Sequence, residues 1–117
     1  MDPLKDQLTN PKLDGVLRAF ELLRLLDREI PGQLVSAFLY IASHNPCHKQ
    51  AMEDELGFTT ASGSRLIDWL SDYHRLGKPG LGLVKKVKDT YNMRRLIVKL
   101  TPKGEALSKQ FLSLLYD

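Results

Sequence analysis

The chain has 117 residues, of which 43% are hydrophobic and 26% charged, and its formal net charge is +3. These values are typical of one globular domain, spanning 1–117, that is large enough to bury a core without disulfides. No apolar run approaches the roughly 20 residues of a membrane span, and the first residues lack the basic and apolar segments of a signal peptide. The single cysteine, Cys47, cannot form an internal disulfide, which favours a cytoplasmic location.

The first half of the chain predicts two helices. Asn10 and Pro11 suit the cap and the first position of a helix over 10–30, which carries leucines at helical spacing. Pro31 and Gly32 end this helix and open a second one, which Asn45-Pro46 stops. The second helix is apolar nearly all round, so we expect it at the centre of the domain.

A helix-turn-helix follows. The first helix runs from about 49 to 56, and Gly57 is expected to cap it in the left-handed conformation. Thr59 is placed to cap a helix over about 60–74, whose inward stripe is expected to be Gly63, Leu66, Ile67, Leu70 and Tyr73. Residues 77–82 form a loop rich in glycine and proline.

The last part predicts a basic hairpin and a helix. Alternation indicates strands over 83–88 and 96–100, and Thr101-Pro102 begins the final helix. Residues 73–104 carry nine Lys and Arg against one acid, a net of +8, whereas 1–72 carry seven against eleven, a net of −4. A basic block confined to one hairpin is typical of a phosphate-facing surface, although edge strands also carry lysines against aggregation.

Helix, turn, helix and basic hairpin in this order indicate a winged helix-turn-helix, a fold that is mainly α with a small β-hairpin. We divide the chain into an N-terminal helix over 10–30, a winged core over 31–101 and a C-terminal helix over 102–117. Both terminal helices are expected to serve dimerisation, because their leucine and phenylalanine stripes exceed what the core can cover.

Residues 31–107 resemble the multiple-antibiotic-resistance regulator (MarR) family of winged-helix repressors. Leu-Gly-Phe-Thr at 56–59 and Ser-Gly-Ser-Arg-Leu-Ile-Asp at 62–68 are similar to the family's helix-turn-helix. Asn-Met-Arg at 92–94 and Leu-Thr-Pro-Lys-Gly at 100–104 resemble its wing signature. The chain departs from the family pattern at Asn92, where an aspartate is usual, at Gly63, where an aliphatic residue is usual, in a longer spacer over 71–82, and in a short C-terminal helix.

The resemblance places the recognition surface on the helix after the turn. Side chains near the start of such a helix reach base edges in the major groove, and small hydroxyl residues let the backbone approach phosphate. Arg65 is the side chain here that can bind guanine through two bonds, unless Asp68 or an acid of the preceding helix pairs with it. The candidate DNA-binding residues of this part are Thr59, Thr60, Ala61, Ser62, Ser64 and Arg65.

The resemblance also assigns Arg94, at the tip of the hairpin, to a minor groove. Other hairpin residues would meet phosphate, and alternation puts Lys85 and Lys99 on a different face from Lys86. The candidate DNA-binding residues of the wing are Lys86, Lys88, Asn92, Arg94 and Arg95.

Other conspicuous side chains favour structural roles. Trp69 lies on the outward side of its helix, and we expect the loop over 75–81 to fold over it. His44, Cys47 and His48 could suggest zinc, but no fourth ligand has standard spacing, and His48 is placed like a helix N-cap. We expect the acids over 53–55 to form the solvated face of their short helix.

We therefore expect a sequence-specific regulator of transcription, acting as a repressor, that binds double-stranded DNA as a homodimer. No enzymatic motif, cofactor, metal or membrane partner is predicted. Two alternatives stay open: a winged-helix protein–protein adaptor in a nucleoprotein or replication assembly, and a ligand- or metal-responsive sensor. A small-molecule effector has no support in the sequence.

Overall fold

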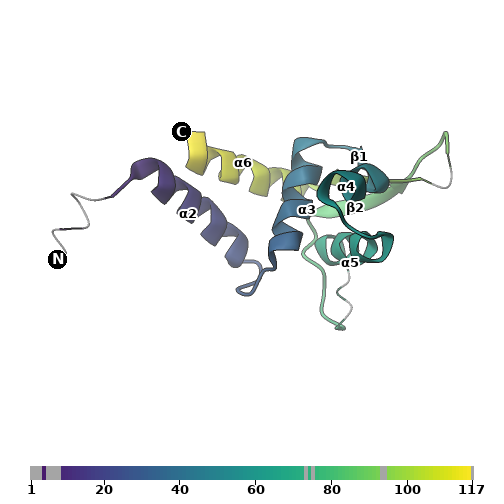
Figure 1. Cartoon of the computed structure of the whole chain (residues 1–117), viewed down its shortest axis with the longest axis horizontal. Helices are drawn as coiled ribbons and strands as arrows, with labels where there is room; N and C mark the ends of the chain where they lie inside the picture. Colours follow the sequence, from purple (N-terminus) through teal and green to yellow (C-terminus); the bar gives the residue numbers. More distant parts are fainter. Residues whose placement is uncertain (1–3, 5–8, 73, 75, 93–94, 117) are drawn as a thin grey trace.

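The structure is a computed structural model that describes residues 4, 9–72, 74, 76–92 and 95–116. The described part is mainly helical and has one small antiparallel sheet, as the sequence predicted. The molecule is long, 59 × 29 × 27 Å, with the terminal helices at one end and the hairpin projecting from the other (Figure 1). The elements are α2 (Pro11–Arg24), α3 (Gly32–Ser43), β1 (Cys47–His48), α4 (Lys49–Leu56), α5 (Thr60–Leu70), β2 (Val84–Lys88), β3 (Leu96–Leu100) and α6 (Pro102–Tyr116).

Helix α3 occupies the centre of the core, which confirms the prediction from its apolar surface. Leu34, Phe38 and Ile41 are buried along it, and they belong to one cluster with Met52 of α4 and Ile67 of α5. Because α4 and α5 pack on this central helix, the buried cluster sets the orientation of the helix-turn-helix relative to the rest of the domain.

Helix α2 begins where the sequence predicted but ends early. The Asn10 side chain accepts hydrogen bonds from the amides of Lys12 and Leu13, as expected of a cap. The helix ends at Arg24 rather than near residue 30, so this prediction was wrong. The Asp27 carboxylate accepts the amide of Glu29 at 3.0 Å, and this turn replaces the helical pattern.

Helix α5 also ends early, at Leu70 rather than near His74. The following chain folds back on the helix end: the amide of Leu83 donates to the carbonyl of Leu70 at 2.8 Å, and that of Leu81 to Trp69 at 2.8 Å. These bonds satisfy carbonyls that another helical turn would otherwise use. Of the predicted inward stripe, Tyr73 lies outside the described residues, and the other four members are buried.

The sheet has the strand order β1-β3-β2. The hairpin pairs Val84 with Leu100 and Lys88 with Leu96, which confirms the two predicted strands within one residue. Strand β1 was not predicted. It consists of Cys47 and His48 alone, which is too short to show alternation.

The junction of the wing and α6 explains the Leu-Thr-Pro-Lys-Gly segment in structural terms. The Thr101 hydroxyl donates to the Gly82 carbonyl at 2.6 Å and accepts the Gly104 amide at 3.1 Å. A Cβ at Gly104 would overlap the carbonyl oxygen of Leu83 and lie 3.1 Å from a methyl of Leu100. Only glycine therefore allows α6 to approach the root of the wing so closely.

The terminal helices α2 and α6 pack side by side (Figure 1). A Cβ at Gly15 would lie 2.8 Å from the carbonyl oxygen of Leu114, so α2 has a glycine where the backbone of α6 comes close. Beside this contact both helices expose apolar side chains. The exposed large apolar side chains of the two helices are Leu13, Val16, Leu17, Phe20, Leu112, Leu114 and Tyr116. No described helix combines the length and apolarity needed to cross a bilayer.

Candidate nucleic-acid interface

The turn between α4 and α5 has the geometry that the sequence predicted. Gly57 adopts a left-handed conformation with φ of 70°, and the amide of Phe58 donates to the Glu53 carbonyl at 3.0 Å. The Thr59 hydroxyl accepts the amide of Ser62 at 3.0 Å and so caps α5. These local bonds set the residue at which α5 begins, and the start of this helix is exposed.

A buried ion pair on α4 contacts the start of α5 below this turn. Glu53 is only 6% exposed, so its prediction as part of a solvated face was wrong. The Lys49 ammonium donates to the Glu53 carboxylate and, at 3.2 Å, to the carbonyl of Thr60. A Cβ at Gly63 would lie 2.7 Å from Cγ and Cδ of Glu53. Glycine at 63 therefore makes room for the acid that pairs with Lys49, the residue whose ammonium bonds α4 to the start of α5.

The outward face of α5 presents the predicted residues. Thr59, Thr60, Ala61 and Arg65 are exposed, and Ser62 and Ser64 are half-buried. The Arg65 guanidinium donates to the Ser62 hydroxyl at 3.1 Å. Within the described part of the chain no carboxylate forms an ion pair with Arg65, so the structural alternative for this side chain has no support there.

Asp68 instead pairs with Lys86 of the wing, Oδ1 to Nζ at 2.7 Å. This ion pair is about 40% exposed on both sides and connects α5 to β2. Lys85 lies opposite Lys99 in the sheet, whereas Lys86 lies opposite Val98. The predicted separation of Lys85 and Lys99 from Lys86 is thus confirmed.

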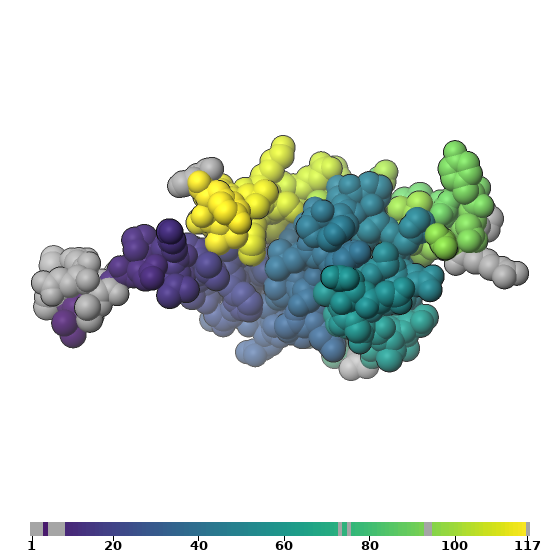
Figure 2. Space-filling view, turned by 45° about the horizontal axis from the view of Figure 1, so that its top comes forward, coloured from purple at the N-terminus to yellow at the C-terminus, as the bar shows by residue number. Residues whose placement is uncertain are grey.

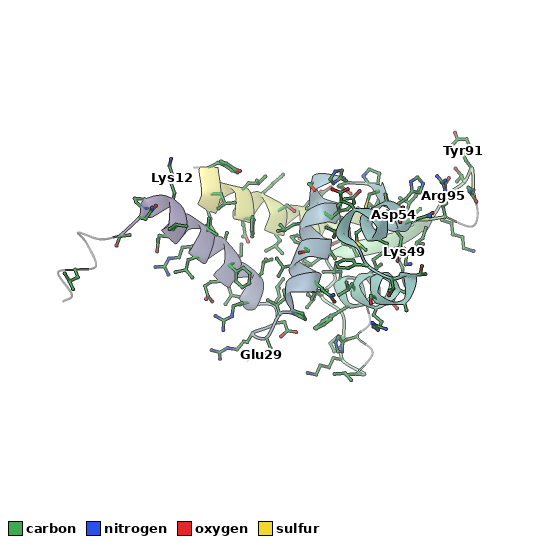
Figure 3. The ribbon with its side chains drawn as sticks, in the orientation of Figure 1. Lys12, Glu29, Lys49, Asp54, Tyr91 and Arg95 are labelled. Atoms are coloured by element: carbon green, nitrogen blue, oxygen red, sulfur yellow. The ribbon has the colours of Figure 1, made fainter. Side chains whose placement is uncertain are left out.

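The far end of the wing is exposed and basic. Lys88, Asn92 and Arg95 are exposed, whereas Arg94 lies outside the described residues. Tyr91 is 99% exposed, which the sequence reasoning missed, and it stands at the outer end of the molecule (Figure 3). A large aromatic side chain without cover at the end of a basic hairpin is suited to contact with another molecule.

A cleft of about 280 Å³ lies between α4, the start of α5 and the wing. Lys49, Asp54 and Arg95 lie at this end of the molecule (Figure 3). The sequence reasoning did not include Lys49 or Gln50, although their position at the start of a helix, where amides favour anions, was a usable signal. The cleft is lined by His48, Lys49, Gln50, Glu53, Asp54, Phe58, Thr60, Arg95 and Leu96.

The long spacer contacts the ring of Trp69 through His74, which lies just before the loop over 75–81 that was predicted to cover it. The ring of Trp69 meets the edge of His74 at a centroid distance of 4.0 Å and is half-buried. A second pocket of about 330 Å³ opens beside it and includes Arg65 on its wall. It is lined by Pro31, Gln33, Ser62, Arg65, Leu66, Trp69, His74 and Leu76.

The three residues considered for zinc have different partners. His44 stacks on Tyr40 at a centroid distance of 4.3 Å, and His48 binds Asp89 at 3.0 Å. His48 is the N-cap of α4 by backbone position, but its side chain makes no capping bond, contrary to expectation. Burial raises the pKa of the Cys47 thiol, which disfavours a reactive thiolate. Among the described residues there is no cluster suited to a metal ion.

No family model and no curated protein matches the sequence. Solved structures do match. MepR of S. aureus in complex with DNA has a TM-score of 0.68 at 21% identity, over 87% of this chain and 76% of that one. A mutant of E. coli MarR with operator DNA has a TM-score of 0.61 at 18% identity, over 99% and 80%.

A further S. aureus MepR structure, of a mutant from a clinical isolate, has a TM-score of 0.65 at 22% identity. The alignment covers 83% of this chain but only 64% of that one. These neighbours are MarR-family transcriptional regulators, and the likeness confirms the MarR-like winged helix-turn-helix fold.

Proposed function

We propose that this protein is a transcriptional regulator that binds double-stranded DNA with α5 in the major groove and the wing against the neighbouring minor groove. The observation that supports this most directly is that Arg65, which is exposed and has no acidic partner among the described residues, belongs to α5, at the same end of the molecule as the basic wing. MepR and the MarR mutant described above, each solved with DNA, share this fold, which supports the same docking geometry here.

The proposed contact residues differ in the part of the DNA that their side chains would bind. Thr60, Ala61 and Arg65 would reach base edges, since they are exposed at the start of α5. Lys88 and Arg95 would hold phosphate from the wing. Thr59 shapes the site through its capping bond. We keep Ser62, Ser64, Lys86, Asn92 and Arg94 as further proposed contacts.

Arg65→Ala tests the assignment. Loss of a guanidinium that binds guanine through two bonds should weaken binding to the preferred duplex by about 1–3 kcal/mol and relax selectivity at one base pair per half-site. Selection from random duplexes, followed by titration at fixed salt, measures both. A loss that is equal on every sequence would make Arg65 a phosphate contact, and no loss would remove it from the interface.

We further propose that the active form is a homodimer and a repressor. The exposed apolar faces of α2 and α6 lie at the opposite end of the molecule from the wing (Figure 1). A second copy placed there would leave both α5 helices free to reach successive turns of one duplex. Repression follows if the bound dimer occupies a promoter, which a reporter gene downstream of the selected site would show.

The pocket beside Trp69 favours one second function, that of a small-molecule sensor. Arg65 forms part of its wall, so an occupant would compete with DNA for this side chain. Thermal-shift screening of small anions, followed by DNA titration with each hit, tests it. A hit that stabilises the protein without weakening DNA binding would exclude this mechanism.

A further inference from the structure

One hydrogen bond crosses the whole sheet at the wing. His48 Nε2 lies 3.0 Å from Asp89 Oδ2. His48 belongs to β1 and Asp89 follows β2, and these strands lie on opposite edges with β3 between them. The bond therefore joins the start of α4, which adjoins β1, to the point where the wing leaves the sheet.

Asp89 also organises the loop that it begins. Its second oxygen, Oδ1, accepts the amides of Tyr91 at 2.8 Å and Asn92 at 3.3 Å. Its own amide donates to the carbonyl of Arg95 at 3.3 Å. The residue is 8% exposed. One carboxylate thus holds the described part of the wing loop with one oxygen and the helix-turn-helix with the other.

We propose that His48 is a positioning residue for the wing and that its protonation strengthens duplex binding. The inference rests on the DNA-binding function proposed above. An imidazolium makes a stronger, charge-assisted bond to Asp89 than a neutral imidazole does. It also adds one positive charge to the cleft between α4 and the wing, where phosphate would pass.

The carboxylate is suited to this role. The hydrogen bond from His48, followed by the amide of Tyr91, lowers the pKa of Asp89 below the ordinary aspartate value. Asp89 therefore stays ionised wherever the protein is folded near neutral pH, and it accepts from His48 in either protonation state. Histidine side chains as a class change charge between about pH 5 and 8.

Some of the charged groups around His48 favour the charged imidazolium, and others oppose it. The wing contributes Asp89, which favours the imidazolium, and Arg95, which opposes it. From α4, Asp54 favours it, whereas the positive end of the helix opposes it. Lys49 is already paired with Glu53, so these two largely cancel.

The test is a titration of one fixed duplex with the full-length protein at constant ionic strength between about pH 5.5 and 8. Wild-type affinity should rise as pH falls, by at most about tenfold per pH unit for the uptake of one proton. His48→Gln keeps an amide donor near the position of Nε2 but cannot titrate. It should bind as the wild type does at the alkaline end and lose most of the pH dependence.

Two further variants separate this role from a general structural one. Asp89→Asn keeps an oxygen for the amides of Tyr91 and Asn92 but removes the negative charge, so it should also flatten the profile. His44→Gln changes a histidine that does not line the cleft and should keep the wild-type slope.

The outcomes distinguish the inference from its premise. A wild-type slope retained in His48→Gln, or a flat wild-type profile with firm binding, overturns the role of His48 and leaves DNA binding intact. Wild-type protein that binds no duplex at any pH rejects the regulator and the inference together.

Discussion

At the scale of single residues, two glycines let neighbouring elements approach more closely than any other residue would allow. Gly63 makes room for the buried Glu53 side chain, and Gly104 for the backbone at Leu83. The two contacts differ in kind. Glu53 presents side-chain atoms, which can be removed by mutation, whereas Leu83 presents a carbonyl that is fixed in the fold.

Gly63→Ala should therefore have opposite effects in two backgrounds. In the wild type the new methyl collides with Glu53, and overpacking of this kind costs about 1–3 kcal/mol, which outweighs the roughly 1 kcal/mol gained in helix propensity. In the Glu53→Ala background the obstruction is gone, so the same change should stabilise. Urea unfolding of the four proteins gives the free energies, and destabilisation of equal size in both backgrounds would contradict the account.

Asp89 predicts a pH-dependent contribution to stability. Its pKa is lowered in the folded state, so its carboxylate stabilises the fold above the ordinary aspartate pKa, and this contribution is lost as pH falls through the folded value. Asp89→Asn should thus be less stable than wild type at pH 7, with the difference shrinking below about pH 4. Denaturation series at several pH values provide the measurement, and a difference independent of pH would be evidence against the ionised pair.

At the scale of elements, an ion pair connects α5 and the wing to each other. The Asp68–Lys86 ion pair connects α5 to β2, and Lys49, which is paired with Glu53 of its own helix, connects α4 to the start of α5 through the carbonyl of Thr60. The first pair is exposed, so it contributes little stability. Its consequence is that Lys86 is partly neutralised on the face where phosphate is expected.

Asp68→Ala should release Lys86 for phosphate. Each additional phosphate contact steepens the plot of log affinity against log salt by about 0.9, and removal of a negative charge should also tighten binding at low salt. Lys88→Ala is the matched control and should make the slope shallower by a similar amount. An Asp68→Ala slope equal to that of the wild type would mean that Lys86 stays away from the duplex.

At the scale of the whole molecule, two surfaces of different character occupy opposite ends of a long shape. The basic wing projects from one end, and the terminal helices α2 and α6 form the other (Figure 2). Leu13, Leu17 and Phe20 expose 66%, 50% and 42% of their surfaces on α2. An apolar face of this kind usually marks an interface.

Leu17→Glu should convert a dimer into a monomer, because it places a charge in the middle of the proposed interface. Sedimentation at micromolar concentration and a footprint on the selected duplex should both show the change, with the footprint reduced to one half-site. Leu76→Glu alters an equally apolar, 68% exposed residue on the spacer and should leave the dimer intact. Wild-type protein that sediments as a monomer would instead favour an adaptor that takes its second contact from another protein.

The sequence by itself determined the order of elements and the positions where most of them begin. Asn10, Gly57 and Thr59 cap their helices and Pro102 begins α6, as predicted. The sequence suffices for this because capping depends on residues within three or four positions of each other. Apolar spacing likewise identified α3 as the central helix and Arg65 as an outward side chain of α5.

Tertiary structure alone decided what depends on residues that are distant in the chain. The end of α5, strand β1 and the burial of Glu53 depend on the path that the chain takes after its helices. Asp89 lies 41 positions from His48, and Lys86 lies 18 from Asp68. No spacing rule encodes such pairs, since each forms only after the sheet has packed against the helix-turn-helix and brought the two side chains within a hydrogen bond of each other.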